Sequence, residues 1–282
     1  SYRFFAQRQL GLQEMDELDT LVDKRDLGVW LHAVLADFHT TLARQPEAER
    51  EARRERLDEA SERVTAALQL PADEFLPFAA AWPALREGYL CWLEEHENQG
   101  MVFVAAETEH RVPHTVGDGG SAWPIELFGR IDRTDRQTTA DGSAAVTWLL
   151  DYKTESRGRT QQRVKEPLEE TQLAFYGALL KDRDVRAAFV SLSESDGVKS
   201  IVHPDIDAAR QALLDGIQAD LRRIAAGEPL RALGDGGACE FCAVRGLCRR
   251  DFIDTLDRPR HGAHSPPVQP DPAVERPGGT TS

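Results

Sequence analysis

Apolar residues recur every three or four positions in the first hundred residues, a spacing that is typical of amphipathic helices. It predicts three helices, over about 27–45, 47–68 and 73–97. The third is expected to pack Trp82, Tyr89 and Trp92 inward. The second carries a run of Arg and Glu, which we interpret as a solvated helix face without a function of its own.

After residue 100 the period of the apolar positions falls to two, as in strands whose side chains alternate between two faces. Three successive strands are predicted, over 101–112, 125–136 and 144–154. The polar stretches GDGGS and QTTADGS separate them as turns. Beyond them the pattern predicts a helix, two short strands and a long helix, over 167–182, 186–195, 198–204 and 205–227. This order of helices and strands indicates an α/β fold.

The composition is that of a globular protein, with 41% apolar and 29% charged residues among 282. No apolar run approaches the roughly 20 residues that span a bilayer, and no signal peptide opens the chain. We therefore expect a soluble, cytoplasmic protein without a membrane partner. The net charge of −14 argues against binding nucleic acid over the whole surface, so any such contact has to be local or supplied by a partner.

Two carboxylates and an amine stand at predicted strand ends. FGRID places Asp132 near the end of one strand, and LLDYK ends the next with Asp151 and Lys153 on one face and Tyr152 on the other. Because neighbouring strands lie about 4.8 Å apart, Asp132 and Asp151 can converge on one Mg²⁺ or Mn²⁺ ion. Lys153 would stabilise charge on a phosphate or orient the attacking water, which predicts metal-assisted phosphodiester hydrolysis. The alternative is an exposed Asp–Lys ion pair, worth under about 1 kcal/mol.

Residues near these positions have both functional and ordinary explanations. Glu107 and Glu109 share a face of the preceding strand and could support the metal, although exposed strand glutamates are common. Arg130 and Arg133 flank Asp132, where local ion pairs are the expected explanation.

Two further features point towards a nucleic-acid backbone. Gln172 and Tyr176 are four residues apart on one helix face and could reach a scissile phosphate, although Tyr176 alone could be a buried aromatic. The stretch 153–165 carries five basic residues against one acidic residue. It is expected to be a loop, either tracking a phosphate backbone or forming a flexible connection.

Several motifs in order carry a family resemblance. PD-(D/E)XK nucleases of the RecB and AddB type carry an Asp, then a D/E-x-K motif and then a Q-x-x-x-Y motif. The segments GRID, DYKT and QLAFY resemble these three motifs and follow the same order. GVWLH, the cysteine run CEFCAVRGLC and the opening YRFFA extend the resemblance from residue 2 to about 252. It implies a restriction-endonuclease-like core with a mixed central β-sheet flanked by helices.

The resemblance also implies roles for individual residues. Asp132, Asp151 and the Tyr152 carbonyl would be metal ligands, Lys153 would be the catalytic lysine, and His32 would be a further metal ligand. Taken by itself, His32 lies among apolar helix residues and would be expected to be a core histidine.

The chain is expected to divide into four parts. These are an N-terminal helical region, the nuclease core, a cysteine-rich segment and a disordered tail, over 1–100, 101–234, 235–254 and 255–282.

The function that the resemblance implies is an exonuclease acting with a helicase in DNA recombination and double-strand-break repair. Its substrate would be single-stranded or end-processed duplex DNA, cut without sequence preference. The chain has no Walker A motif G-x-x-x-x-G-K-[ST], so it cannot itself be the motor. The alternatives are a stand-alone nuclease and an inactive scaffold or DNA-binding module that keeps the fold.

Three cysteines form the pattern C-x₂-C-x₅-C, namely Cys239, Cys242 and Cys248, which suits thiolate ligation of iron or zinc. A fourth ligand is needed, and Cys91 is expected to be a small core residue instead. In the family the fourth cysteine directly precedes the segment that YRFFA resembles. We therefore expect this chain to be a piece of a longer polypeptide, with a [4Fe-4S] cluster that is incomplete here.

Overall fold

The computed structural model describes residues 3, 5–12, 24–70, 72–117, 122–138, 145–165, 171–180, 184–194, 196–229, 239, 242 and 244–248. The chain divides into two compact units. One combines 1–15 with 230–282, and the other covers 16–229. The predicted disordered tail, 255–282, lies outside the described residues.

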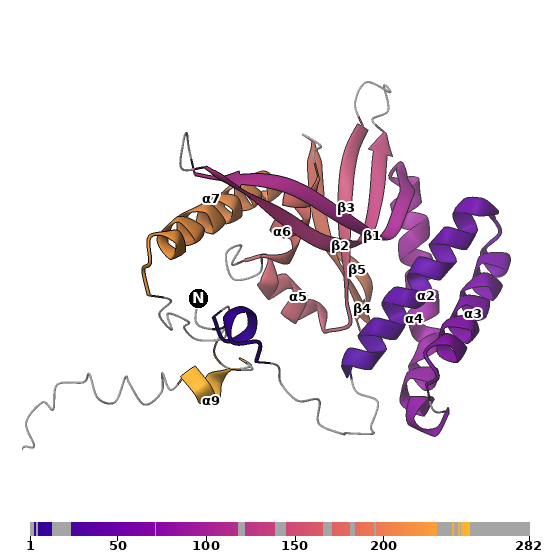
Figure 1. Ribbon diagram of the computed structural model, residues 1–282. Helices are drawn as coiled ribbons and strands as arrows, with labels where there is room; N and C mark the ends of the chain where they lie inside the picture. Colours follow the sequence, from indigo (N-terminus) through magenta and orange to yellow (C-terminus); the bar gives the residue numbers. More distant parts are fainter. Residues whose placement is uncertain are drawn as a thin grey trace, which may run out of the picture. The chain divides into compact units, whose positions relative to one another are not determined.

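The larger unit is built on one five-stranded sheet in the order β1-β2-β3-β4-β5 (Figure 1). Its strands are β1 (Met101–Val116), β2 (Trp123–Thr138), β3 (Ala145–Lys153), β4 (Val185–Ser193) and β5 (Gly197–Val202). The first three strands form the predicted meander, β3 pairs with β4 in parallel, and β4 pairs with β5 antiparallel. The prediction of a mixed sheet is confirmed.

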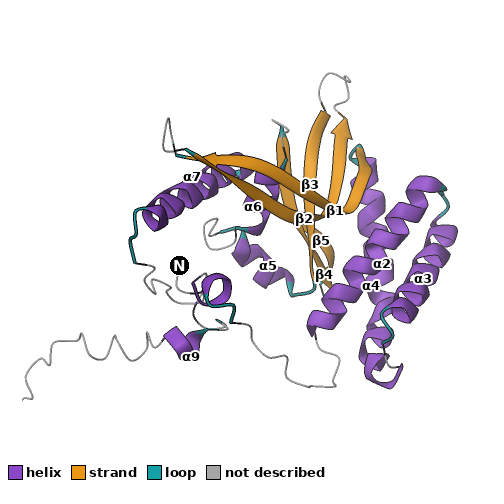
Figure 2. Cartoon of the chain, viewed as in Figure 1, coloured by secondary structure: helices purple, strands orange, loops and turns teal. Residues whose placement is uncertain are grey.

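Helices cover both faces of this sheet (Figure 2). On one face lie α2 (Lys24–Arg44), α3 (Arg50–Ala67) and α4 (Ala72–Asn98), the three predicted N-terminal helices. On the other lie α6 (Gln172–Leu179) and α7 (Ile206–Ala225). The link between β3 and β4 also contains a short helix, α5 (Arg157–Arg163).

The alternation of side chains along β3 explains why both faces are covered. Leu150 and Tyr152 are buried in the core formed with α2, α3 and α4. Leu149, one position before Leu150, is buried in the core formed with α6 and α7. A strand that is apolar on both faces needs a helix layer on each side, because neither face can be left to water.

The N-terminal helices pack as their apolar period predicts. Trp82, Tyr89 and Trp92 are all buried. The charged run of α3 is more than a solvated face, since its arginines form ion pairs across to α4. Arg50 reaches Glu94 at 2.8 Å, and Arg53 and Arg54 reach Glu97 and Glu87, both at 2.7 Å. Each of these half-exposed pairs contributes little by itself, but together they orient α3 against α4.

The smaller unit contains two short described elements. A π-helical turn, η1, covers Phe5–Gln9, and one helical turn, α9, covers Arg245–Cys248. The α9 turn begins just after Cys242, whose carbonyl accepts a hydrogen bond from the backbone N–H of Arg245 at 2.9 Å. Among the described residues of the whole chain, no helix is both long enough and apolar enough to cross a membrane.

Candidate active site

The site is built where β2 separates from β3. The two strands pair only from Arg133, which lies opposite Leu150, to Thr138, which lies opposite Ala145. Asp132 is the residue just before this ladder begins, so it lies inside β2 and not near its end as predicted. Ile131, Asp132 and Arg133 are buried one after another, which interrupts the alternation of faces. The end of the ladder, rather than the end of a strand, therefore positions Asp132.

Because β2 and β3 part here, the backbone groups of Tyr152 need other partners. The Tyr152 N–H donates to Asp132 Oδ2 at 3.2 Å. The Tyr152 carbonyl lies 3.0 Å from His32 Nε2, which reaches the site from α2. The other ring nitrogen of His32, Nδ1, lies 3.3 Å from Asp132 Oδ2. Three of the predicted metal ligands thus surround one point.

The electrostatics of His32 reflect this acidic setting. Burial lowers its pKa, but the hydrogen bond to Glu107 and the charges of Asp132 and Asp151 outweigh burial, so the pKa is raised above its ordinary value. A histidine ligates a metal only in its neutral form, so binding a cation here would release a proton.

Glu107 also belongs to the site. The register of β1 and β2 puts it opposite Asp132, between the pairs Ala106–Arg133 and Thr108–Ile131. Its backbone has a φ of +50°, which is rare for a residue with a side chain. Strained backbone angles of this kind are found more often at functional sites. Among the described residues, His32, Glu107 and Asp132 form a group whose ligand atoms all lie within 4.8 Å of one another.

Three other charged residues that the sequence singles out lie in different places, namely Glu109, Arg130 and Arg133. Glu109 is exposed and does not belong to this group. Arg130 Nε lies 2.9 Å from Glu107 Oε2, so the predicted local ion pair of Arg130 is confirmed. Arg133 also has a local partner, Asp135, but it is fully buried on the opposite face of the sheet.

Asp151 is completely buried, yet neither of its carboxylate oxygens accepts a hydrogen bond from the residues that the structure describes. Its charged neighbour is Lys153, whose Nζ lies 2.6 Å from Oδ2 as an ion pair. Burial and then the charge of Asp132 raise the pKa of Asp151 to about 7. Buried carboxylate oxygens without donors are costly unless a cation compensates them. Asp151 lies outside the group of His32, Glu107 and Asp132 whose ligand atoms are within 4.8 Å of one another, but together with Asp132 it gives the site two buried carboxylates, which fit a divalent metal ion.

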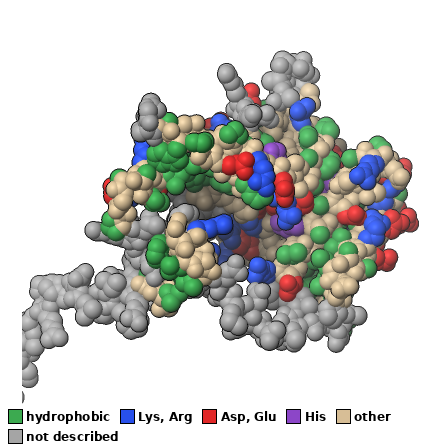
Figure 3. Space-filling model, in the orientation of Figure 1, with side chains coloured by type: hydrophobic (Ala, Val, Ile, Leu, Met, Phe, Trp, Pro, Cys, Tyr) green, Lys and Arg blue, Asp and Glu red, His purple; other side chains and the backbone are tan. Residues whose placement is uncertain are grey.

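Lys153 and Asp132 are also joined by a chain of side chains from α6. Lys153 Nζ donates to Gln172 Oε1 at 2.7 Å, and Gln172 Nε2 donates to the Tyr176 hydroxyl at 3.0 Å. The Tyr176 hydroxyl in turn donates to Asp132 Oδ1 at 3.3 Å. Gln172 and Tyr176 share a helix face as predicted, and that face is turned towards the acidic cluster. Acidic, basic and histidine side chains gather on the surface where β1 and β2 pass α2 (Figure 3).

The basic stretch 153–165 is not the loop that was predicted, because much of it forms α5. Its one acidic residue, Glu155, accepts from Arg163 at 2.6 Å and pairs with Arg159 at 3.3 Å. Arg157 and Lys165 are exposed. Fewer cations are therefore left for a phosphate backbone than the sequence indicates.

The cysteines occupy two different settings. Cys239, Cys242 and Cys248 are half-buried in the smaller unit, where the Cys242 N–H donates to the Cys239 carbonyl at 3.4 Å. Within the described residues, their sulfur atoms are not close enough together to form a group that could hold a metal ion. Cys91 is exposed, so its prediction as a core residue is wrong. It lies two positions after Tyr89, which places it on the opposite side of the helix, near Arg50.

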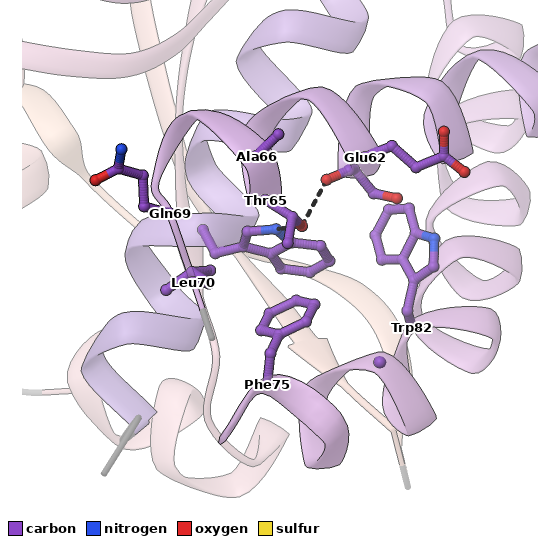
Figure 4. Close-up of a pocket in the computed structure, with 10 residues that line it drawn as sticks. Glu62, Thr65, Ala66, Gln69, Leu70, Phe75 and Trp82 are labelled. Atoms are coloured by element: carbon purple, nitrogen blue, oxygen red, sulfur yellow. Dashed lines mark hydrogen bonds between the residues drawn. The ribbon is translucent and has the colours of Figure 1, made fainter. Parts of the chain in front are cut away.

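A pocket of about 570 Å³ lies among α2, α3 and α4 (Figure 4). Thr65 points into it from α3, and Phe75 and Trp82 point into it from α4. Trp30 lines the pocket and donates from Nε1 to Thr65 Oγ1 at 2.9 Å. Trp30 and His32 are two positions apart on α2 and so face opposite ways. The pocket is separate from the candidate metal site.

The mixed sheet between helix layers, with carboxylates and a lysine where two strands part, defines a restriction-endonuclease-like α/β protein. Residues 1–249 match the family model of the PD-(D/E)XK nuclease superfamily. The chain belongs to this superfamily, which indicates a nuclease that uses a divalent metal and acts on DNA. No curated protein matches the chain.

Proposed function

We propose that this chain hydrolyses phosphodiester bonds of DNA with the help of Mg²⁺ or Mn²⁺. The observation that carries the proposal is the buried Asp151 carboxylate, which lacks hydrogen-bond donors among the described residues and lies beside Lys153. A core that merely stabilised the fold would have no need for a buried pair of carboxylates, Asp132 and Asp151, beside an amine.

The roles follow from what each group can supply. His32, Asp132, Asp151, Glu107 and the Tyr152 carbonyl would hold the cation, and a set rich in oxygen favours Mg²⁺ or Mn²⁺. When bound, such an ion supplies positive charge to a phosphate and lowers the pKa of a bound water molecule.

The remaining polar residues would act on the substrate. Lys153 would stabilise charge that develops on the phosphate, because its ammonium group lies beside the Asp151 carboxylate. Gln172 holds Lys153, and Tyr176 holds Asp132, so both would keep the two groups at a fixed spacing.

We further propose the finer assignment that the order of motifs implies. The chain would be a nuclease of the RecB and AddB type, acting as an exonuclease on single-stranded or end-processed DNA with a helicase partner. Its cellular role would be recombination and double-strand-break repair in the cytoplasm. The motif order GRID, DYKT and QLAFY supports this assignment.

The direct test is incubation with end-labelled single- and double-stranded DNA in Mg²⁺, Mn²⁺ or EDTA. We expect cleavage with either metal and none with EDTA. Asp151→Asn should abolish cleavage, whereas Glu109→Gln, which removes a carboxylate outside the cluster, should cleave like the wild type. Cleavage by Asp151→Asn at the wild-type rate would overturn the assignment. A wild-type chain that binds DNA but does not cut it with either metal would favour the scaffold alternative.

An iron–sulfur cluster held by Cys239, Cys242 and Cys248 is also part of the proposal. Iron and sulfide are measured in anaerobically purified protein. We expect substoichiometric iron that falls further in Cys242→Ser and is unchanged in Cys91→Ser. Loss of iron only in Cys91→Ser would make Cys91 the ligand, and stoichiometric zinc would replace the iron–sulfur assignment.

A further inference from the structure

A second polar cluster lies on the other face of the sheet from the candidate metal site, beneath α2 and α4. At its centre Arg133 donates from Nε and Nη2 to the two carboxylate oxygens of Asp135, at 2.7 and 2.8 Å. His96 Nε2 lies 2.7 Å from Asp135 Oδ2. The Arg133 side chain is 2% exposed and the Asp135 side chain is 0% exposed. A charged pair is therefore fully enclosed within the apolar core.

Such a pair is poorly explained by stability alone. Removing a guanidinium and a carboxylate from water costs free energy that their attraction only partly returns, and apolar side chains of similar volume often stabilise a core better. The pair therefore calls for a role that apolar side chains could not fill.

The cluster contacts the candidate metal site through Tyr152. Arg133 Nη1 lies 2.7 Å from His39 Nε2, 2.9 Å from the Tyr89 hydroxyl and 3.3 Å from the Tyr152 hydroxyl. The two tyrosine hydroxyls lie 3.0 Å apart. The far end of the Tyr152 ring is thus held by a charged donor and by a second buried hydroxyl group.

The near end of Tyr152 is its backbone, which belongs to the metal site. Its N–H orients the Asp132 carboxylate, and its carbonyl faces His32. Arg133 also follows Asp132 directly and forms the first pair of the β2–β3 ladder, opposite Leu150. A shift of the ring or of Arg133 would therefore move the Tyr152 carbonyl and the Asp132 carboxylate together.

We propose that Arg133, held by Asp135 and His96, is a positioning residue that fixes the metal ligands of the site from the opposite face of the sheet. It acts by anchoring the Tyr152 hydroxyl, so that the Tyr152 backbone and Asp132 keep one geometry. This inference rests on the proposed function, because it takes the site to bind a divalent cation. Groups that orient metal ligands commonly change metal affinity by about tenfold or more when they are altered.

The test uses three variants of the full chain. Tyr152→Phe removes only the hydroxyl that Arg133 holds. Arg133→Lys keeps the charge but loses the planar fork that serves Asp135 and the tyrosine at once. Thr65→Val is the matched control, because it removes a hydroxyl that accepts from the buried Trp30 in the same helix layer but makes no contact with the cluster. If Arg133→Lys fails to fold, Tyr152→Phe alone decides the question.

Mn²⁺ affinity is measured by calorimetry without DNA, and melting temperature is measured on the same samples. We expect Tyr152→Phe and Thr65→Val to lower the melting temperature by similar amounts, whereas only Tyr152→Phe weakens Mn²⁺ binding, on the order of tenfold. Arg133→Lys should weaken it at least as much.

Mn²⁺ binding by Tyr152→Phe within twofold of wild type would overturn the positioning role and make the cluster a structural core, while leaving the proposed function standing. A wild-type chain that binds no Mn²⁺ would overturn both. Mn²⁺ binding without DNA cleavage would contradict the proposed function alone.

Discussion

Two buried aspartates on opposite faces of one sheet differ in how completely they are hydrogen bonded. Asp135 accepts two hydrogen bonds from Arg133 and lies 2.7 Å from His96 Nε2. Asp151 accepts none from the described residues, although it is just as deeply buried. A carboxylate with its full set of donors is part of the folded framework, whereas one without donors is prepared for a cation.

The pKa values of the two groups reflect the same contrast. Burial raises the pKa of both carboxyls, but for Asp135 the charge of Arg133 and the hydrogen bonds outweigh it, and the pKa is held well below its ordinary value. For Asp151 burial prevails and is reinforced by the charge of Asp132, so the pKa rises to about 7. The two faces of the sheet therefore give opposite electrostatic environments to the same side chain.

Replacing each carboxylate by its amide should have the largest effects, and they should be opposite in kind. Asp135→Asn leaves the buried Arg133 without its charged partner, so we expect it to lower the free energy of unfolding by about 3–5 kcal/mol. Asp151→Asn removes a buried carboxyl whose pKa is raised to about 7, so at neutral pH it should not lower the free energy of unfolding, while it should slow cleavage on the order of a thousandfold. Urea denaturation measures the free energy of unfolding, and single-turnover kinetics measure the cleavage rate. Equal loss of stability in both variants would contradict the predicted difference between Asp135 and Asp151.

His32→Ala should have the next largest effect, and on cleavage rather than on stability. The ring contacts Asp132 and the Tyr152 carbonyl and is not part of the apolar core of α2. We expect cleavage to fall about 10- to 100-fold, as for altered metal-site groups, with a small change in melting temperature. Retained cleavage with a large drop in melting temperature would make His32 a core residue.

The pH dependence of stability should also separate the two aspartates. The folded-state pKa of Asp151 is raised, so its contribution to stability is present at pH 4 and is lost as the pH rises through about 7. The folded-state pKa of Asp135 is lowered, so its contribution to stability is present at neutral pH. That contribution is lost as the pH falls below the ordinary pKa of an aspartate. In metal-free protein, Asp151→Asn should therefore gain stability relative to wild type between about pH 4 and 7. A difference that stays constant over this range would contradict the raised pKa.

The elements and the central motif residues could be predicted because they depend on local pattern. The period of three or four predicts α2, α3 and α4, and the period of two predicts the meander. Asp132, Asp151 and Lys153 stand out because charged residues interrupt apolar strands. These signals are carried by residues next to one another in the chain.

The other site features depend on contacts between distant parts of the chain. Glu107 joins the site through the register of β1 against β2 and through its left-handed backbone, neither of which a single strand shows. From the sequence, Arg133 is expected to be a surface residue with a local ion-pair partner. In the structure α2 and α4 bury it. The helix α5 was missed because pairing of its arginines with Glu155 stabilises a stretch that has no apolar period.

The central claim is that the cluster around Asp151 holds a divalent cation, and titration of the metal-free protein with Mn²⁺ at pH 8 tests it most directly. Three proteins are compared: wild type, Asp151→Asn and Lys153→Ala. Asp151 is expected to ligate the ion, and Lys153 to act on the phosphate. The account therefore predicts that wild type and Lys153→Ala bind Mn²⁺ and are raised in melting temperature by it, while Asp151→Asn loses both effects. Mn²⁺ binding by Asp151→Asn with wild-type affinity would contradict the account.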